Sequence, residues 1–322
     1  MARRASARRA LGGSALGSSL LLGGCGLMAS ESTGGVDGRI TLGFVNGGTS
    51  EFHTCLQESV RRTARNYSVE LHTANSRQDA ETEAANIDDL IARHVDALIV
   101  QTVDVDVLKG DIAKAKAAGV PIFLTSVTPE DTSDILGAVV VDLTEVGRLD
   151  AEWIEKDAAD RQVTVGVNAG APGAASDVLV DAFLKRLPDN ARVVANEPGM
   201  YDPGKAGTVA EGIVRAHPGL DYAFVANEEM AFAARKAFDA AGAKDIRIVT
   251  VNGTDEALAA LKDGRFAATV SNSAADTDEL AVENAVSLLR GETAEKVDKT
   301  RVRLVTKDNA DTAPLYCPVD DY

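Results

Sequence analysis

The sequence predicts an α/β fold made of two similar lobes, each with its own parallel sheet. Short runs rich in β-branched residues alternate with helix-length amphipathic segments along nearly the whole chain. This order places parallel strands between two layers of helices. The chain also repeats itself at a spacing of about 125 residues, since DALIVQ at 96–101 corresponds to DYAFVA at 221–226. In each copy a helix ending in Ala-Gly and then another strand follow, which indicates two lobes of one design.

Eleven strands are expected along the chain. They comprise residues 40–45, 69–73, 97–101, 121–125, 135–141, 163–167, 192–196, 222–226, 247–252, 267–271 and 301–305. Helices fill most of the intervals, because apolar residues recur there at three- and four-residue spacing. One helix start is well marked: Asp142 is a capping residue, and Glu145 three positions later can reach back to the helix terminus.

The N-terminal region has the pattern of an export signal. Four arginines precede a short apolar run that ends Leu-Leu-Gly-Gly-Cys at residues 21–25, and this run is too short to cross a bilayer as a helix. Its end resembles a bacterial lipobox, in which the cysteine carries the lipid after cleavage. We therefore expect a signal peptide over residues 1–24, a lipid on Cys25 and a flexible tether over residues 25–38. An ordinary signal peptide in which Cys25 has no role is the alternative, and both the general and the twin-arginine export routes remain open.

The composition argues against several classes of function. Removal of the four arginines of the signal leaves 29 basic and 49 acidic residues, a net charge of −20. Such a charge repels nucleic acid and anionic headgroups, so any membrane attachment would depend on the lipid. The four histidines show no metal-binding spacing, and no GxSxG elbow or dinucleotide-binding glycine motif occurs. We expect no enzymatic activity, no cofactor and no metal.

The stretch GFVNGGTS at residues 43–50 has two glycines at the spacing of a phosphate-binding loop. Thr49 occupies the place of the lysine, so the charge that such a loop directs at the outer phosphates is missing. A strand-to-helix turn, in which glycine lets the backbone bend, is the simpler interpretation.

Four motifs resemble those of the ribose/galactose-type solute-binding proteins that serve ABC transporters. They are GVPI at 119–122, ANEEMA at 226–231, VNGTD at 251–255 and LKDGRFAATV at 261–270. The resemblance extends from about residue 39 to about residue 307. It implies a type I periplasmic binding protein fold, with two Rossmann-like lobes joined by a hinge of three crossings. The N-terminal lobe would comprise residues 39–141 and 273–299, and the C-terminal lobe residues 142–272 and 300–322.

The resemblance also implies a ligand site between the lobes, and GFVNGGTS would then form the lip of a sugar cleft. The family's pocket positions carry hydroxyl, amide, aromatic and ionisable side chains here: Ser50, Phe52, His53, Thr125, Ser126, Asp177, Tyr201, Asn227, Asn252 and Asn272. Such groups suit the hydroxyls and the C–H faces of a polyol. Purely structural roles are the alternative for some of them: helix capping for Asn227, a turn for Asn252, the helix dipole for Asp177 and simple exposure for His53.

The expected ligand is a neutral polyol, a modified sugar or an amine-bearing relative, in preference to ribose. The family often has an Asp-Arg pair where this chain has Thr125-Ser126, and aspartate is usual at Asn252. The negative and the positive charges that the family has at these positions are therefore both missing here. Asp177 would be the remaining formal charge at the site, and His53 would be the group there able to carry the opposite charge near neutral pH. Sugar acids are expected to bind worst.

The implied partner is the permease of an ABC transporter in the cell membrane. Service to a membrane sensor kinase or a chemoreceptor is the alternative. The lactose-repressor family shares the two-lobed core, but a regulator of that kind would need a DNA-binding headpiece where this chain has an export signal.

Cys55 and Cys317 are the two cysteines that remain once Cys25 carries a lipid. An even pair in an oxidising compartment favours a disulfide. Because Cys317 lies on a tail beyond the last predicted strand, this bond would pin the tail across the hinge region.

Replacement of Cys25 by serine is expected to release the protein from the membrane or to leave it unprocessed. Stable anchoring takes more than one acyl chain, and in this protein all of them would depend on Cys25. Membrane fractionation combined with acyl labelling checks the result. Unchanged membrane retention without any labelled acyl group would contradict the prediction.

Overall fold

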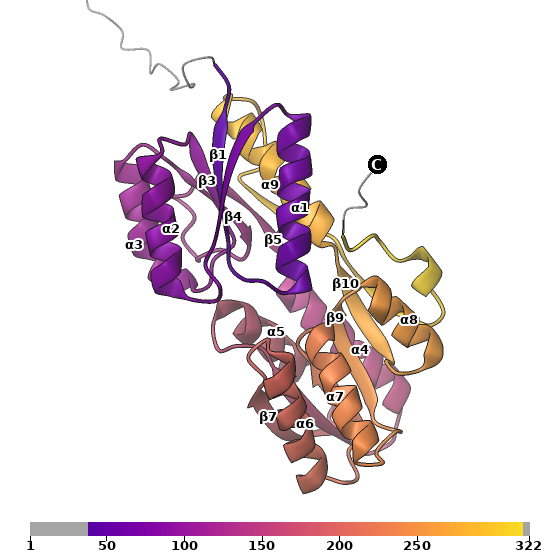
Figure 1. Ribbon diagram of the computed structural model, residues 1–322. Helices are drawn as coiled ribbons and strands as arrows, with labels where there is room; N and C mark the ends of the chain where they lie inside the picture. Colours follow the sequence, from indigo (N-terminus) through magenta and orange to yellow (C-terminus); the bar gives the residue numbers. More distant parts are fainter. Residues whose placement is uncertain (1–37, 318–322) are drawn as a thin grey trace, which may run out of the picture. The chain divides into compact units, whose positions relative to one another are not determined.

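The computed structural model describes residues 38–317, apart from the side chain of Ala174. The predicted signal peptide and Cys25 lie outside the described residues. Two six-stranded sheets, each covered by helices on both faces, make up the fold (Figure 1). We call each sheet with its helices a lobe. All eleven expected strands overlap strands of the structure, and the predicted α/β fold class is confirmed.

The sheet of the first lobe is entirely parallel, with the order β11-β5-β4-β3-β1-β2. Helices α1 and α9 cover one face, and α2 and α3 cover the other. The strands are β1 (Thr41–Asn46), β2 (Glu70–Asn75), β3 (Ala97–Val100), β4 (Ile122–Ser126), β5 (Gly137–Val141) and β11 (Val297–Thr300). The helices are α1 (Glu51–Asn66), α2 (Ala80–Ala92), α3 (Val105–Ala117) and α9 (Ala274–Leu289). Strand β11 was not expected, because it is a short edge strand whose sequence VDKT has charged residues at its centre.

The sheet of the second lobe has the order β12-β10-β9-β8-β6-β7. Helices α4 and α5 cover one face, and α6, α7 and α8 cover the other. The strands are β6 (Val163–Ala169), β7 (Ala191–Pro198), β8 (Tyr222–Val225), β9 (Arg247–Asn252), β10 (Ala268–Asn272) and β12 (Val302–Thr306). The helices are α4 (Leu143–Ala158), α5 (Ala174–Arg186), α6 (Pro203–Ala216), α7 (Glu228–Ala240) and α8 (Asp255–Asp263), and the short helix η1 (Ala310–Thr312) follows β12.

Strand β12 corrects the expectation of two wholly parallel sheets. It pairs antiparallel with β10, because the chain enters it directly from β11 of the other lobe without a crossover helix. The chain thus passes between the two sheets three times: after β5, after β10 and between β11 and β12.

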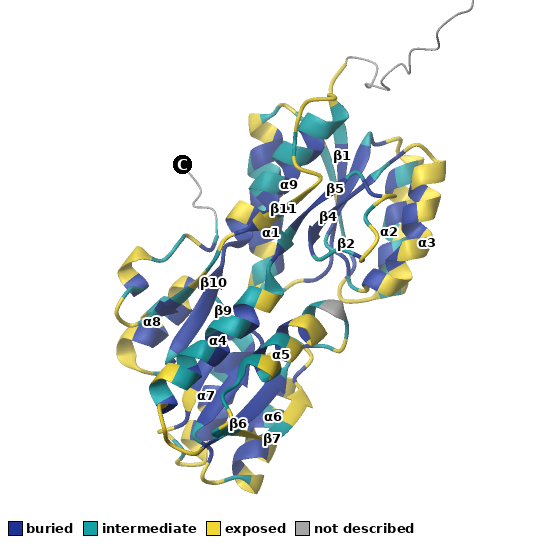
Figure 2. Ribbon diagram, turned by 180° about the vertical axis from the view of Figure 1, so that it is seen from behind, coloured by how far each residue is buried: buried dark blue, intermediate teal, exposed yellow. Residues whose placement is uncertain are grey.

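The central strands of both sheets are buried on their two faces, and the exposed residues gather on the outer sides of the helices (Figure 2) and on the edge strands β2 and β7. Successive strand residues alternate between the layers: Phe44 packs with α1 and α9, whereas Val45 packs with α2 and α3. Burial on both faces explains why the central strands have nearly continuous apolar sequences. No helix in the part of the chain that the structure describes has both the length and the apolar character needed to cross a membrane.

The aspartate that begins each copy of the sequence repeat joins two neighbouring strands. Asp96 accepts a hydrogen bond from the backbone N–H of Thr41 at 2.7 Å, and Asp221 accepts one from the backbone N–H of Thr164 at 2.7 Å. The repeat DALIVQ and DYAFVA therefore reflects one device used in both lobes.

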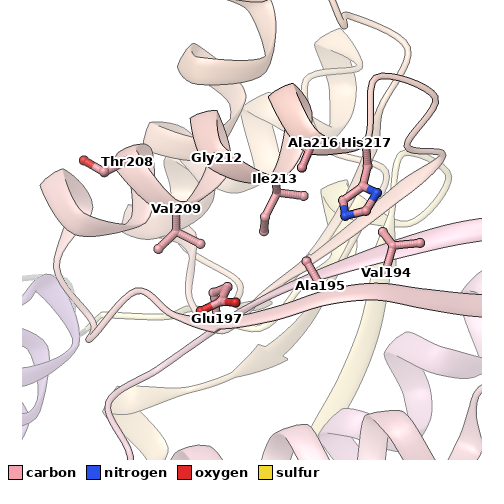
Figure 3. Close-up of a pocket in the computed structure, with 9 residues that line it drawn as sticks. All are labelled: Val194, Ala195, Glu197, Thr208, Val209, Gly212, Ile213, Ala216 and His217. Atoms are coloured by element: carbon pink, nitrogen blue, oxygen red, sulfur yellow. The ribbon is translucent and has the colours of Figure 1, made fainter.

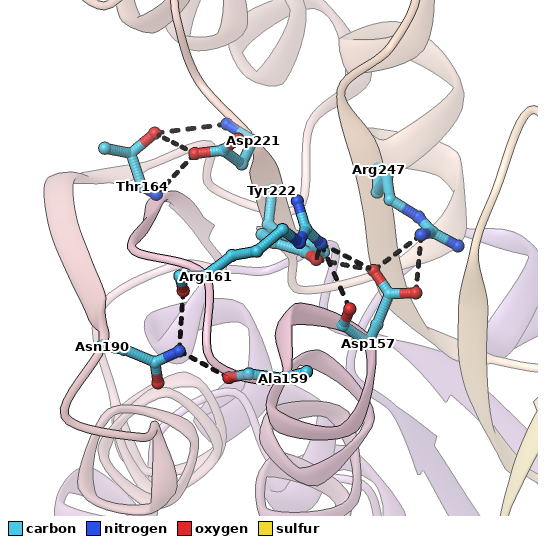
Figure 4. Close-up of polar contacts among 8 residues, drawn as sticks. All are labelled: Asp157, Ala159, Arg161, Thr164, Asn190, Asp221, Tyr222 and Arg247. Atoms are coloured by element: carbon cyan, nitrogen blue, oxygen red, sulfur yellow. Dashed lines mark hydrogen bonds and ion pairs between the residues drawn. The ribbon is translucent and has the colours of Figure 1, made fainter.

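In the second lobe this device belongs to a wider polar network at the amino ends of the strands (Figure 4). Asp157 accepts hydrogen bonds from the Tyr222 hydroxyl and the Arg247 guanidinium, both at 2.6 Å. The Asn190 amide donates to the carbonyl oxygens of Ala159 and Arg161, each at 2.7 Å. This network fixes the end of the sheet that lies opposite the carboxyl ends of its parallel strands.

A disulfide joins Cys55 on α1 to Cys317 on the C-terminal tail, with the two Cα atoms 5.0 Å apart. The two residues are 262 positions apart in the sequence. The tail beyond β12 is thus covalently attached to a helix of the first lobe.

Three of the carboxylic acids buried among the helices accept hydrogen bonds from threonine hydroxyl groups: Glu83, Glu228 and Asp278. Burial raises the pKa of Glu83 to about 7, that of Glu228 to about 7 and that of Asp278 to about 8. Hydrogen bonds to neighbouring hydroxyl groups oppose these shifts, among them the bond of 2.8 Å that Thr125 Oγ1 donates to Asp278. All three pKa values remain above those of exposed carboxylic acids. Asp150 of α4 is also fully buried, and burial raises its pKa well above its usual range.

These pKa values predict that the fold loses stability as the solution becomes alkaline. Each folded-state pKa lies above that of the unfolded chain, so the stabilising contribution is complete at acidic pH and is lost as pH rises through the folded-state pKa. We expect the free energy of unfolding, measured by urea denaturation, to fall by at least about 2–4 kcal/mol between pH 6.5 and pH 8.5, because Asp150 adds to the contributions of the other three acids. Asp278→Asn, which mimics the protonated acid, should remove about 1–2 kcal/mol of this decrease.

Asp189→Asn serves as the control, because Asp189 is exposed and its replacement should leave the decrease unchanged. An equal decrease in the native protein and in Asp278→Asn would refute the assignment to Asp278.

Candidate functional site

A cavity of about 450 Å³ lies between the two lobes, at the carboxyl ends of the parallel strands. Each of the ten strands β1 to β10 supplies a lining residue at its last positions or in the loop or first helical turn that follows. The first lobe contributes Thr49, Ser50, Phe52, His53, Gln78, Gln101, Thr102, Val103, Val105, Ser126, Val127 and Val141. The second lobe contributes Leu143, Ala171, Pro172, Gly173, Ala175, Ser176, Leu179, Met200, Tyr201, Asp202, Lys205, Ala226, Asn227, Val251, Asn252 and Asn272. Open α/β sheets bind ligands at this edge.

The structure brings most of the residues selected from the sequence together around this cavity. Those that line it are Ser50, Phe52, His53, Ser126, Tyr201, Asn227, Asn252 and Asn272. Asn227 also caps α7, because its side chain accepts a hydrogen bond from the backbone N–H of Met230 at 2.9 Å.

Thr125 and Asp177 are not among the lining residues. Thr125 precedes Ser126 in β4, so its side chain points to the other face of the sheet, where it bonds to Asp278 of α9. Asp177 lies in the first turn of α5 and is exposed. The position next to Ser126 that does line the cavity is Val127.

Two glycines of the stretch GFVNGGTS make room for cavity side chains. The backbone N–H of Gly47 donates to Gln101 Oε1 at 3.0 Å. A Cβ atom at Gly48 would lie 2.5 Å from Gln78 Nε2 and 2.7 Å from His53 Cε1. Glycine is needed at position 48 because a neutral amide and an imidazole pack directly against its Cα.

His53 is held as a neutral imidazole in the cavity wall. Its Nδ1 lies 2.7 Å from Ser50 Oγ, and its Nε2 lies 3.4 Å from the amide nitrogen of Gln78. The amide nitrogen of Gln78 can only donate, so this geometry fits His53 Nε2 as the acceptor and His53 Nδ1–H as the donor to Ser50. Burial lowers the pKa of His53 to about 4, and a hydrogen bond with Gln101 opposes this shift only in part.

Backbone strain gathers at the cavity. Nine non-glycine residues in the described part of the chain have a positive φ, and five of them line the cavity. These five are Gln78 (φ 62°), Ser126 (78°), Met200 (62°), Tyr201 (52°) and Asn252 (139°). Strained backbone of this kind concentrates at ligand sites, where the surrounding structure holds it in place.

Two buried polar atoms that face the cavity lack a partner. Ser126 is 8% exposed and Asn272 is 5% exposed, and neither Ser126 Oγ nor Asn272 Oδ1 makes a hydrogen bond. They belong to different lobes and both line the cavity. A buried polar atom without a partner costs free energy, so a ligand with hydroxyl groups would relieve both sites at once.

The interior of the cavity carries no formal charge. Among the lining residues that the structure describes, only Asp202 and Lys205 are charged, and both are exposed. Asp202 Oδ1 accepts from the backbone N–H of Lys205 at 2.7 Å and so caps α6. The pairing of Asp177 with a charged His53 that the sequence suggested does not occur, because His53 is neutral near pH 7 and Asp177 lies outside the cavity.

Buried carboxyl groups hold two of the loops that carry cavity residues. Glu83 accepts hydrogen bonds from Thr102 Oγ1 at 2.6 Å and from the backbone N–H of Val103 at 2.7 Å. Glu228 accepts from the backbone N–H groups of Gly253 and Thr254, at 2.7 and 2.8 Å. These bonds fix the loops after β3 and β9.

Sequence reasoning missed several polar residues of the cavity: Gln78, Gln101, Thr102 and Ser176. A simple signal was available for three of them, because Gln101 ends a predicted parallel strand and Thr102 and Gln78 follow such strand ends within five residues. Ser176 lies nine residues beyond the predicted strand 163–167 and had no such signal. Among the described residues, no three His, Cys, Asp or Glu side chains are grouped as they would be around a metal ion.

A second hollow lies between β7 and α6, at the outer edge of the second sheet (Figure 3). Its lining is largely apolar, with Glu197 on the strand and His217 at the helix end. Unlike the interlobe cavity, it has no buried polar atom without a partner among its lining residues. It also lies apart from the convergence of the strand ends, so the interlobe cavity is the candidate site.

Comparison with known proteins agrees with this geometry. A family model described as a periplasmic binding protein domain matches residues 42–293. The chain is 27% identical over 281 residues to the ribose import binding protein of Bacillus subtilis (strain 168), a match that covers 87% of this chain and 91% of that protein. It is 28% identical over 272 residues to the xylitol-binding protein of Mycolicibacterium smegmatis, covering 82% and 76%.

A solved structure shares the same arrangement. The periplasmic binding protein of the arabinose ABC transporter from Shewanella sp. ANA-3, bound to α- and β-L-arabinofuranose, matches with a TM-score of 0.79 at 28% identity. The match covers 84% of this chain and 93% of that chain.

The environment of His53 predicts that its ring stays neutral throughout the physiological range. Because burial lowers its pKa to about 4, we expect no titration of the His53 ring between pH 5.5 and pH 8 in NMR spectra. His53→Asn identifies the resonance by its disappearance. A midpoint above pH 6 for that resonance would contradict the burial of His53 in the cavity wall.

Proposed function

Because the chain belongs to the periplasmic binding protein family, we propose that it captures a neutral sugar or polyol between its two lobes and delivers it to the permease of an ABC transporter. The family consists of solute-binding proteins, so the chain is a binding protein and no enzyme. The observation that carries the proposal is the uncharged cavity in which Ser126 and Asn272, one from each lobe, bury unpartnered oxygen atoms.

The chemistry of the lining residues supports a polyhydroxylated ligand. Each ligand hydroxyl can donate and accept, and the amides and hydroxyls of the cavity offer both functions. Phe52 and Tyr201 bring an aromatic ring from each lobe, and such rings suit the C–H faces of a sugar. Bound in this way, the ligand contacts both lobes and stabilises their closed arrangement.

The absence of formal charge inside the described cavity favours a neutral ligand over an amine or a sugar acid. A buried amine would need a carboxylate partner, and a buried carboxylate would need a cation. The charged lining residues Asp202 and Lys205 stand at the exposed rim and already interact through the α6 cap. The neutral His53 cannot supply a charge near pH 7.

The proposal includes attachment to the membrane on its extracytoplasmic side. Its basis is the lipobox-like sequence before Cys25 and the acidic composition of the remaining chain, which does not favour attachment through basic residues. The proposed lobe boundaries are those of the sequence: residues 39–141 with 273–299, and residues 142–272 with 300–322. The three passages of the chain between the sheets would form the hinge.

Calorimetry with ribose, xylitol, L-arabinose, myo-inositol, glucosamine and glucuronate tests the proposed ligand class. We expect a neutral member of this panel to bind at micromolar strength or better, and glucosamine and glucuronate to bind more weakly. Asn272→Ala should weaken binding by about 1–3 kcal/mol, because a ligand hydroxyl then loses its partner.

A pair of glycine variants separates the cavity from general stability. Gly48→Ala places a methyl group against His53 and Gln78 and should reduce the affinity of the tightest ligand at least about tenfold. Gly110→Ala on α3 is the matched control, since no atom lies within 4 Å of its added Cβ. Failure of every neutral member of the panel to bind, or tightest binding of glucuronate, would reject the proposed ligand class.

A further inference from the structure

The C-terminal chain first completes the second lobe and then leaves it. Strand β12 pairs with β10, and Ala310 of η1 is buried in the core beneath α8. The Arg303 guanidinium of β12 donates to the carbonyl oxygen of Thr312 at 2.6 Å. Up to Thr312, therefore, every anchor of this segment belongs to the second lobe.

Residues 313–317, which we call the strap, then cross to the first lobe. Ala313 still packs against the second-lobe core, and the contacts with the first lobe begin at Leu315. Ser273 Oγ, at the start of α9, donates to the carbonyl oxygen of Leu315 at 2.9 Å, and the backbone N–H of Ala275 donates to that of Tyr316 at 3.1 Å. The Tyr316 side chain is 3% exposed in the core formed by α1, α9 and the first sheet. Cys317, the last residue of the strap, forms the disulfide with Cys55. The strap is a fourth connection between the lobes, after the three chain passages.

The strap ends on the helix that presents cavity residues. Cys55 lies two positions after His53 on α1, whose first turn also carries Phe52. The N-cap residue Ser50 does not cap this helix, because its hydroxyl is engaged with His53. Instead, the backbone N–H of Glu51 donates to Glu229 Oε1 of α7 in the second lobe, at 2.9 Å. The amino end of α1 is thus tied to second-lobe residues through Glu229 and through the strap.

We propose that the strap is a positioning element for ligand capture, which holds the first turn of α1 over the cavity and limits how far the two lobes can separate. The proposal rests on the proposed function only in that capture requires closure of the lobes. An unbound protein with its strap intact samples fewer widely open arrangements, so a larger fraction is competent to bind. A disulfide that only stabilised the fold would leave both the opening and the affinity unchanged.

Small-angle X-ray scattering of the ligand-free protein tests the limit on opening. The comparison uses the full chain with Cys25→Ser, which removes the third thiol, with and without the further changes Cys55→Ser and Cys317→Ser. We expect the variant without the disulfide to have a larger radius of gyration and to bind the tightest member of the panel of ribose, xylitol, L-arabinose and myo-inositol about tenfold more weakly. The data are taken well below the unfolding temperature of each variant, with circular dichroism to verify that it is folded.

Reduction of the folded Cys25→Ser protein with dithiothreitol breaks the same disulfide and repeats the comparison even if the variant without the two cysteines does not fold. Where the variant without the disulfide folds, it is the control for dithiothreitol, and its scattering should not change when the reagent is added. An unchanged radius of gyration after loss of the disulfide overturns the proposal, whatever the fall in unfolding temperature. The scattering needs no ligand, so an expansion without any sugar binding would uphold the limit on opening and reject the proposed ligand class instead.

Discussion

The parallel pairing of β1 to β10 is the constraint on which the site depends. Because the strands of each lobe run in one direction, their carboxyl ends share one edge of the sheet, and ten separate segments can place side chains around a single cavity. The two exceptions support this reading. Strand β12 is antiparallel and β11 is an outer edge strand, and neither contributes a lining residue.

Convergence of strand ends alone would not give a defined surface, since the segments after the strands are loops and helix starts. Buried groups beneath the cavity surface hold these loops and helix starts in place. Glu83 and Glu228 accept backbone N–H groups of the loops after β3 and β9, and glycine at position 48 lets Gln78 and His53 pack closely. The same burial raises the pKa of both glutamates and lowers that of His53. Rigidity of the cavity and part of the pH dependence of stability therefore have one cause.

The fold was predictable from the sequence because the alternation of strands and helices and the internal repeat are local patterns. The site was predictable only to within a residue: Thr125 and Ser126 are neighbours in β4, and a shift of one position moves a side chain to the opposite face of the sheet. The neutrality of His53 was not predictable, because its pKa depends on burial by segments distant in the sequence. Strand β11 was missed because its charged residues suit an exposed edge and give no apolar pattern.

The antiparallel direction of β12 determines where the C-terminal tail begins. Strand β12 begins opposite Asn272, at the carboxyl end of β10, and ends opposite Ala268, at its amino end. The chain has then completed the second sheet and lies at the edge away from the cavity. Nothing in the sheet requires residues 313–317, yet they return to Ser273 at one of the passages between the lobes and bury Tyr316 against the first lobe. The attachment to α1 accounts for this return, because it gives the tail a contact that neither sheet provides.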